Sequence, residues 1–120
     1  MLSEHFDRSE FACKGACNCG CDTVDYELLR VLEMVRAHFH SPVRVTSAFR
    51  CLEHNRSIGS KDSSMHCQGK ASDIQVMDVK PETVYNFLNR WSPTGLGLGL
   101  YKEKGFVHVD VRTGKARWEG

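Results

Sequence analysis

The strongest constraint on the fold is a strict alternation near the C-terminus, Phe106–Arg112. With a period of two, its three valines face one way, while Phe106, His108, Asp110 and Arg112 face the other. This pattern predicts a β-strand with one face in a hydrophobic core. A strand whose opposite face carries His, Asp and Arg is either solvated there or lines a site.

A second segment, Ala71–Val76, alternates in the same way. Ile74 and Val76 share one face, and Asp73 lies on the opposite face. We therefore expect Asp73 to point away from the core. A shorter alternating run from Val43 predicts another strand after Pro42.

Two helices are expected from apolar residues at helical spacing. The first, over residues 24–38, has apolar residues at steps of four, three and four: Leu28, Leu32, Val35 and Phe39. The second begins at Pro81 and places apolar residues on one side: Val84, Phe87, Leu88 and Trp91. Residues 52–64 should form a loop or a short helix, and residues 96–118 two strand-like runs separated by a turn at 102–105.

This order of elements predicts an α+β fold with a small, mainly antiparallel sheet flanked by helices. A chain of 120 residues, 41% of them apolar, suits a single domain over residues 1–120. The cysteine-rich segment 1–22 is expected to form short turns packed on that domain.

Charge and hydropathy narrow the choice of partners. The formal charge is +1, and basic and acidic residues are interspersed, so we expect neither nucleic acid nor a membrane as partner, and we expect a monomer. The start of the chain lacks the apolar run of a secretory signal. This predicts a protein that is cytoplasmic when synthesised.

Six cysteines are present, and four of them crowd together at Cys13, Cys17, Cys19 and Cys21. They could form disulfides in an oxidising compartment, or be thiols or ligands of a structural zinc in a reducing one. Their CxxxCxCxC spacing is not a standard zinc pattern. A second, structural zinc at these four residues is an alternative that we keep open but do not favour.

His66 lies seven residues before Asp73, with Gly69 between them. A turn at Gly69 could bring both side chains to one point. His108 lies on the polar face of the strand predicted at Phe106–Arg112. Two imidazoles and a carboxylate suit zinc, and three protein ligands leave a fourth position open for water or substrate. Spacing alone is weak support, because pairs of His and Asp are common.

The run Ser64–Asp73 resembles a known motif, SxHxxGxAxD, of the zinc D-Ala-D-Ala carboxypeptidases, and matches it at every specified position. The resemblance extends to Val45–Cys51 with the following His54–Arg56, and to Phe106–Arg112. It covers most of the chain from about Cys13 to Trp118, and is strongest to the short single-domain members of bacteria and phages. It implies the fold of that family, a small antiparallel sheet flanked by helices that is shared with the hedgehog signalling domain.

The resemblance also implies roles for individual residues. His66, Asp73 and His108 would be the zinc ligands, and Arg50 would bind a substrate carboxylate, a task suited to a planar bidentate donor. Ser64 would hydrogen-bond the substrate or orient His66.

The general base is where the sequence departs from the family pattern. Several members have an acidic residue three before the last histidine, but Gly105 occupies that position here. Glu103 and Asp110 are the remaining candidates. Glu103 could instead be a solvated charge in a turn, and Asp110 could instead orient His108 or pair with Arg112.

The resemblance therefore implies a zinc-dependent peptidase that cleaves peptidoglycan stem peptides, as a D-Ala-D-Ala carboxypeptidase or as an endopeptidase. Acting on the cell wall would suit a phage endolysin that a separate protein releases from the cytoplasm. The alternative is a non-catalytic, zinc-containing module that binds cell-wall peptides or is structural, which Gly105 would permit.

Overall fold

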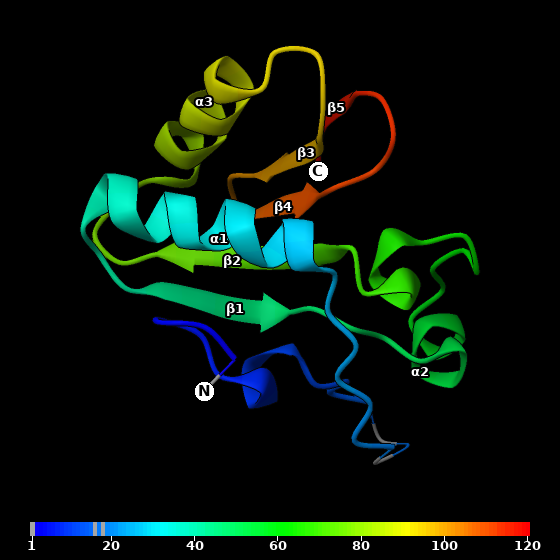
Figure 1. The fold of residues 1–120 in the computed structure, drawn as a ribbon. Helices are drawn as coiled ribbons and strands as arrows, with labels where there is room; N and C mark the ends of the chain where they lie inside the picture. Colours follow the sequence, from blue (N-terminus) through cyan, green and yellow to red (C-terminus); the bar gives the residue numbers. More distant parts are fainter. Residues whose placement is uncertain (1, 16, 18) are drawn as a thin grey trace.

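The computed structural model describes residues 2–15, 17 and 19–120, and its centre is one five-stranded sheet (Figure 1). The strands are β1 (Val43–Ser47), β2 (Ala71–Val76), β3 (Gly97–Tyr101), β4 (Phe106–Asp110) and β5 (Ala116–Glu119). Their order is β1-β2-β4-β3-β5; the pairs β1–β2, β2–β4 and β4–β3 are antiparallel and β3–β5 is parallel. The α+β prediction with a mainly antiparallel sheet is confirmed. The parallel strand β5 was not predicted as a separate element, because its four residues, Ala-Arg-Trp-Glu, form an alternating run at the lower limit of strand length.

In the part of the chain that the structure describes, three α-helices and two 3-10 helices precede or connect the strands. They are η1 (Arg8–Phe11), α1 (Tyr26–Phe39), α2 (Leu52–Ser57), η2 (Met65–Gln68) and α3 (Pro81–Trp91). The helix α1 begins two residues later than predicted, because Asp25 caps it by accepting a hydrogen bond from the Glu27 backbone N–H. It ends at His40, which adopts the left-handed conformation.

Helices α1 and α3 pack on the same side of the sheet, as Figure 1 shows, and enclose the core. The strand residues that face them are buried and apolar: Ile74, Val76, Leu98, Leu100, Val107 and Val109. Phe6 and Phe11 of the N-terminal segment join the same core. Each fully buried side chain of this size contributes about 1.5–3 kcal/mol, so this layer fixes which strand faces turn outward.

The opposite face of the sheet has one row of residues in register across four strands. Asp73 on β2 pairs with His108 on β4, which pairs with Gly99 on β3, which pairs with Trp118 on β5. In the segment Gly95–Leu100 the leucines enter the core, and the strand glycines fall on the polar face. The missing side chain of Gly99 leaves space that Trp118 fills.

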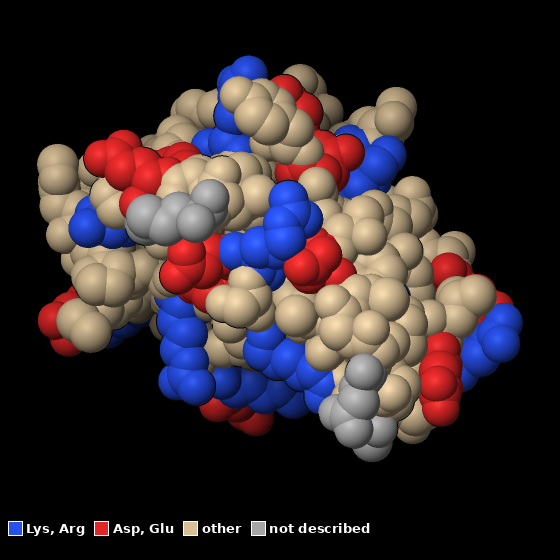
Figure 2. All heavy atoms as spheres, turned by 60° about the horizontal axis from the view of Figure 1, so that its bottom comes forward, with Lys and Arg blue, Asp and Glu red and all other residues tan. Residues whose placement is uncertain are grey.

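The surface carries charges of both signs. On the face drawn in Figure 2, Lys and Arg side chains lie beside Asp and Glu side chains, as their interspersed positions along the chain predict. Among the helices of the described residues, none has the length and apolar character needed to cross a membrane.

Candidate metal centre

His66, Asp73 and His108 come together at the polar face of the sheet, from η2, β2 and β4. Each offers one ligand atom, and these atoms lie within 4.8 Å of one another. The Asp73 Oδ1 atom is 3.5 Å from His66 Nε2 and 3.1 Å from His108 Nδ1. All three residues are buried. The side chains that the sequence grouped as metal ligands therefore lie together in the structure.

The ring of His66 is oriented by the backbone around it. Its Nδ1 lies 2.7 Å from the carbonyl oxygen of Ala48, which can only accept, so Nδ1 carries the proton. The Nε2 lone pair therefore faces Asp73. The turn that holds His66 begins at Ser64, whose hydroxyl accepts from the His66 backbone N–H at 3.2 Å, and ends at Gly69 with φ of 69°.

The ring of His108 is oriented by a carboxylate. Its Nε2 lies 2.7 Å from Oδ2 of Asp110, a residue without solvent exposure. The Arg112 guanidinium holds the same carboxylate through Nε and Nη2, each at 2.8 Å. Burial raises the pKa of Asp110, but the hydrogen bonds from Arg112 and His108 outweigh it and hold that pKa well below its usual range. An ionised Asp110 accepts from Nε2–H, and this leaves the Nδ1 lone pair of His108 facing Asp73.

The three side chains fit a zinc ion. The Asp73 side chain lies between the two rings, with its Oδ1 atom close to one nitrogen of each. Two imidazole lone pairs thus converge on a carboxylate oxygen, an arrangement that repels itself unless a cation lies between the three atoms. Two nitrogen donors and one oxygen donor form a common set for zinc with an open coordination position.

A cleft of about 940 Å³ opens in front of these residues. Arg50 lines it, with Nη2 at 3.8 Å from Asp73 Oδ2 and Nη1 donating to Asn55 at 3.3 Å. Ser64 lines it as well, beside Lys61 and Lys104. The structure therefore places both predicted substrate-binding residues in the cleft with the metal-binding group.

Trp118 and Tyr101 form part of the cleft wall that the sequence had not singled out. The indole ring lies 5.0 Å from the His108 ring, centroid to centroid, and its Nε1 donates to the Tyr101 hydroxyl at 2.9 Å. The alternation of glycine and leucine before Tyr101 is the signal that a bulky neighbour could cross this strand at Gly99.

The two candidate general bases lie in different surroundings. Glu103 is exposed on the turn between β3 and β4, outside the group of residues that line the cleft. Asp110 lies behind His108, with its oxygens engaged by His108 and Arg112. The alternative second metal set also changes, because Cys21 lies outside the group formed by the other N-terminal cysteines.

A buried His–Asp–His group beside a cleft, on a small α+β sheet, has the ligand set expected of a mononuclear zinc hydrolase. Comparison with family models gives Peptidase M15 over residues 4–110. The chain belongs to the peptidase M15 family of zinc-dependent, D-Ala-D-Ala carboxypeptidase-like peptidases, and the resemblance found in the sequence is confirmed. The comparison with curated proteins gives no match.

Proposed function

We propose that this protein is a zinc peptidase that hydrolyses peptidoglycan stem peptides. The observation that carries the proposal is the convergence of His66 Nε2, Asp73 Oδ1 and His108 Nδ1 at the base of a cleft that also holds Arg50. Zinc bound there would supply Lewis-acid activation of water and of the peptide carbonyl. This substrate would place its action at the bacterial cell wall, as for a phage-type endolysin.

The charge of the cleft supports an acidic peptide as substrate. Arg50, Lys61 and Lys104 line the cleft, and Asp73 is the acidic residue among its described lining residues. A guanidinium binds a carboxylate in a bidentate geometry, so Arg50 would hold the terminal carboxylate of D-Ala-D-Ala or a carboxylate within the stem. Its hydrogen bond to Asn55 fixes the direction of the side chain.

Asp110 serves in this proposal as a positioning residue, because its oxygens accept from His108 and Arg112 and it has no exposure to the cleft. Of the two carboxylates predicted as proton acceptor, this leaves Glu103, which is exposed on the turn next to the cleft-lining Lys104 but does not itself line the cleft. Glu103→Gln would then lower kcat by about 10²–10⁴-fold without changing zinc content.

A second candidate is a module that binds zinc and cell-wall peptide without cleaving it. It is favoured by Gly105 at the family's acidic position and by the absence of a second carboxylate among the described residues that line the cleft. An unchanged kcat in Glu103→Gln would show that Glu103 is not the base, whereas absence of product from the zinc-loaded wild type would favour this candidate.

The test is cleavage by the zinc-loaded protein, with products identified by mass. Three substrates are compared: intact peptidoglycan, a peptide ending in D-Ala-D-Ala, and the same peptide with an amidated C-terminus. We expect cleavage of at least one, loss of it in His66→Ala, and retention in His40→Asn, which changes an exposed histidine whose left-handed backbone suits Asn. Release of terminal D-Ala indicates a carboxypeptidase, and internal products indicate an endopeptidase. Zinc and peptide binding without any product would contradict the peptidase and leave the binding module.

A further inference from the structure

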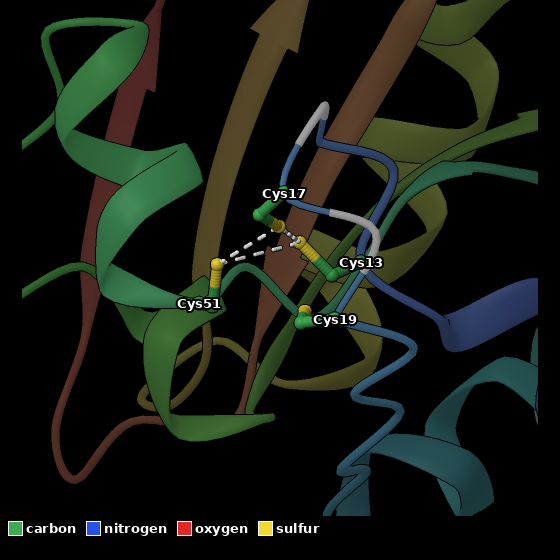
Figure 3. A group of neighbouring side chains, drawn as sticks. All are labelled: Cys13, Cys17, Cys19 and Cys51. Carbon is green, nitrogen blue, oxygen red and sulfur yellow. Dashed lines mark hydrogen bonds between the residues drawn. The ribbon is translucent and has the colours of Figure 1, made fainter.

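Four cysteine sulfurs meet on the side of the molecule where the N-terminal segment reaches α2. Cys13, Cys17 and Cys19 of that segment gather with Cys51, the residue that caps α2, and their Sγ atoms lie within 4.8 Å of one another. We call this group the thiol cluster. Figure 3 shows the sulfurs of Cys13, Cys17 and Cys51 pointing toward one another.

The spacing of these sulfurs is that of metal ligands. The Sγ–Sγ distances are 3.4 Å for Cys17–Cys51, 3.8 Å for Cys13–Cys51 and 3.9 Å for Cys13–Cys17. Four sulfurs around zinc at about 2.3 Å form a tetrahedron with edges of about 3.8 Å. A disulfide instead requires one pair of sulfurs at about 2.05 Å.

We propose that the thiol cluster is a second, structural zinc site with four thiolate ligands, separate from the His–Asp–His centre. Binding of one zinc ion would displace the four thiol protons into solvent, with no change in the oxidation state of sulfur. Such closed four-thiolate sites contribute folding free energy and leave no position for substrate.

Cys51, and not Cys21 as the sequence suggested, is the fourth member of the thiol cluster. The Cys21 backbone carbonyl accepts from the Cys13 N–H at 2.7 Å, and the Cys21 side chain is exposed. Cys51 lies a few residues after β1 and is 38 positions from Cys13 in the sequence. Its sulfur nevertheless contacts that of Cys13 in the N-terminal segment. Local spacing could not reveal a ligand contributed from so far along the chain.

The thiol cluster joins the N-terminal segment to the chain that carries Arg50. Cys51 directly follows Arg50, and its sulfur accepts from the His54 backbone N–H at 3.4 Å. Gly15 packs so closely on the His54 ring that a Cβ there would overlap it. Zinc in the thiol cluster would thus fix the position of the residue that we propose to bind the substrate carboxylate.

The experiment counts zinc in protein purified under reducing, anaerobic conditions. We expect about two zinc ions per chain in the wild type, about one in Cys51→Ser and about one in His66→Ala. Cys21→Ser is the matched control, because it removes an N-terminal cysteine outside the thiol cluster and should keep both ions. Cobalt in place of zinc should show thiolate charge-transfer absorbance that Cys51→Ser removes and His66→Ala retains.

A measurement on the wild type keeps the proposal testable if Cys51→Ser does not fold. With zinc present, Cys21 and Cys67 should be alkylated while the thiol cluster is protected, and a chelator should expose all six cysteines. A single zinc per chain that is lost in His66→Ala and kept in Cys51→Ser, loss of zinc in Cys21→Ser, or disulfides in the freshly purified protein would each overturn the proposal. None of these measurements uses a peptide substrate, so their outcome is independent of the proposed peptidase activity.

Discussion

At the residue scale, Gly99 matters through the side chain that it lacks. Its neighbours in the row across the sheet are His108 on one side and Trp118 on the other, and the indole occupies the space above Gly99. A methyl group there would overlap the indole, whose Nε1 donates to Tyr101. The position of the cleft wall beside His108 thus depends on a glycine that touches no substrate.

Gly99→Ala should lower the free energy of unfolding by about 1–3 kcal/mol, because the added methyl group overpacks a filled space. It should also change the tryptophan fluorescence, since Trp118 must move. Chemical denaturation followed by fluorescence measures both effects. Gly95→Ala is the control, because a Cβ there meets the end of the Ser92 side chain. Equal stability of the two variants would contradict this role for Gly99.

Asp110→Asn separates a positioning residue from a general base. We expect zinc affinity at the His–Asp–His centre to fall by about 10–100-fold, because the amide is a weaker partner for His108 Nε2–H. Excess zinc should restore most of kcat, and the pH profile should keep its shape. Competition with a chelator gives the affinity, and Asp78→Asn, at an exposed residue with φ of 60°, is the control. Unchanged zinc affinity with kcat lowered by about 10²–10⁴-fold would instead identify Asp110 as the base.

The residues of the candidate metal site could be predicted because their side-chain chemistry coincides with a local sequence pattern. The motif from Ser64 to Asp73 and the strand of His108 placed three side chains that do converge. The contacts that orient these ligands were harder to predict from the sequence. The Ala48 carbonyl that fixes the His66 tautomer is a backbone group, and any residue type at position 48 would provide it.

At the element scale, Arg117 on β5 connects its strand to the end of α3. Its guanidinium donates to the side chain of Asn89 at 2.7 Å, and to three carbonyl oxygens of the following loop: those of Ser92, Gly95 and Leu96. Without the Arg117 guanidinium, each of these three carbonyl oxygens would lose a hydrogen-bond donor. The Arg117 side chain thus fixes the connection between α3 and β3, the strand that contains the two glycines.

Arg117→Met should lower the free energy of unfolding by about 3 kcal/mol, because several charge-assisted hydrogen bonds are lost together. Arg90→Met is the matched control, since Arg90 is exposed at the end of the same helix. Denaturant titration of the three proteins gives the comparison. A loss for Arg117→Met no greater than that for Arg90→Met would show that these contacts do not stabilise the fold.

Glu33 of α1 holds the N-terminal segment. Its carboxylate accepts from the Ser3 hydroxyl, from the His5 backbone N–H at 2.9 Å, and contacts His5 Nδ1 at 2.7 Å. Burial raises the pKa of Glu33, but the hydrogen bonds from Ser3 and His5 outweigh it and lower the pKa below its ordinary value. Because the folded-state pKa is lower than the unfolded one, the carboxylate stabilises the fold above about pH 4.3, and this contribution is lost as the pH falls through the folded-state pKa.

Glu33→Gln should therefore cost about 1 kcal/mol at neutral pH, and the difference from the wild type should shrink as the pH falls below about 4. Urea denaturation over a range of pH measures this difference. The two proteins share their candidate metal ligands, so the effects of pH on metal binding cancel. Glu27→Gln, at an exposed position of the same helix, is the control. A difference that stays constant across this pH range would contradict the role of the Glu33 carboxylate.

Most elements were predictable because local pattern and tertiary burial agree in them. The strand Ala71–Val76 and the helix starting at Pro81 lie where the alternation and the helical stripe indicated. The strand β5 was not predictable, because its four residues gain their order from pairing with β3 and from the contacts of Arg117. The alternation within these four residues is too short to indicate a strand without those long-range contacts.

At the scale of the whole molecule, metal binding and folding should be linked. A ligand that binds the folded chain only, at about 100 times its Kd, raises the free energy of unfolding by about 2.7 kcal/mol. For a domain of this size that corresponds to an increase of about 10 °C in Tm. Zinc titration followed by thermal unfolding should show this rise, and His66→Ala should lose the part that belongs to the His–Asp–His centre. A Tm equal in both proteins at every zinc concentration would contradict metal binding there.

The row that contains Asp73, His108, Gly99 and Trp118 makes the candidate site depend on correct strand pairing. A slip of β4 by one residue would turn His108 into the core and bring a valine out in its place. A sheet in which β2 and β4 pair one residue out of register would therefore lack the metal site, and zinc affinity would distinguish it from the native pairing. For such a chain, zinc present during refolding would favour the native topology among compact alternatives that bury nearly the same apolar surface.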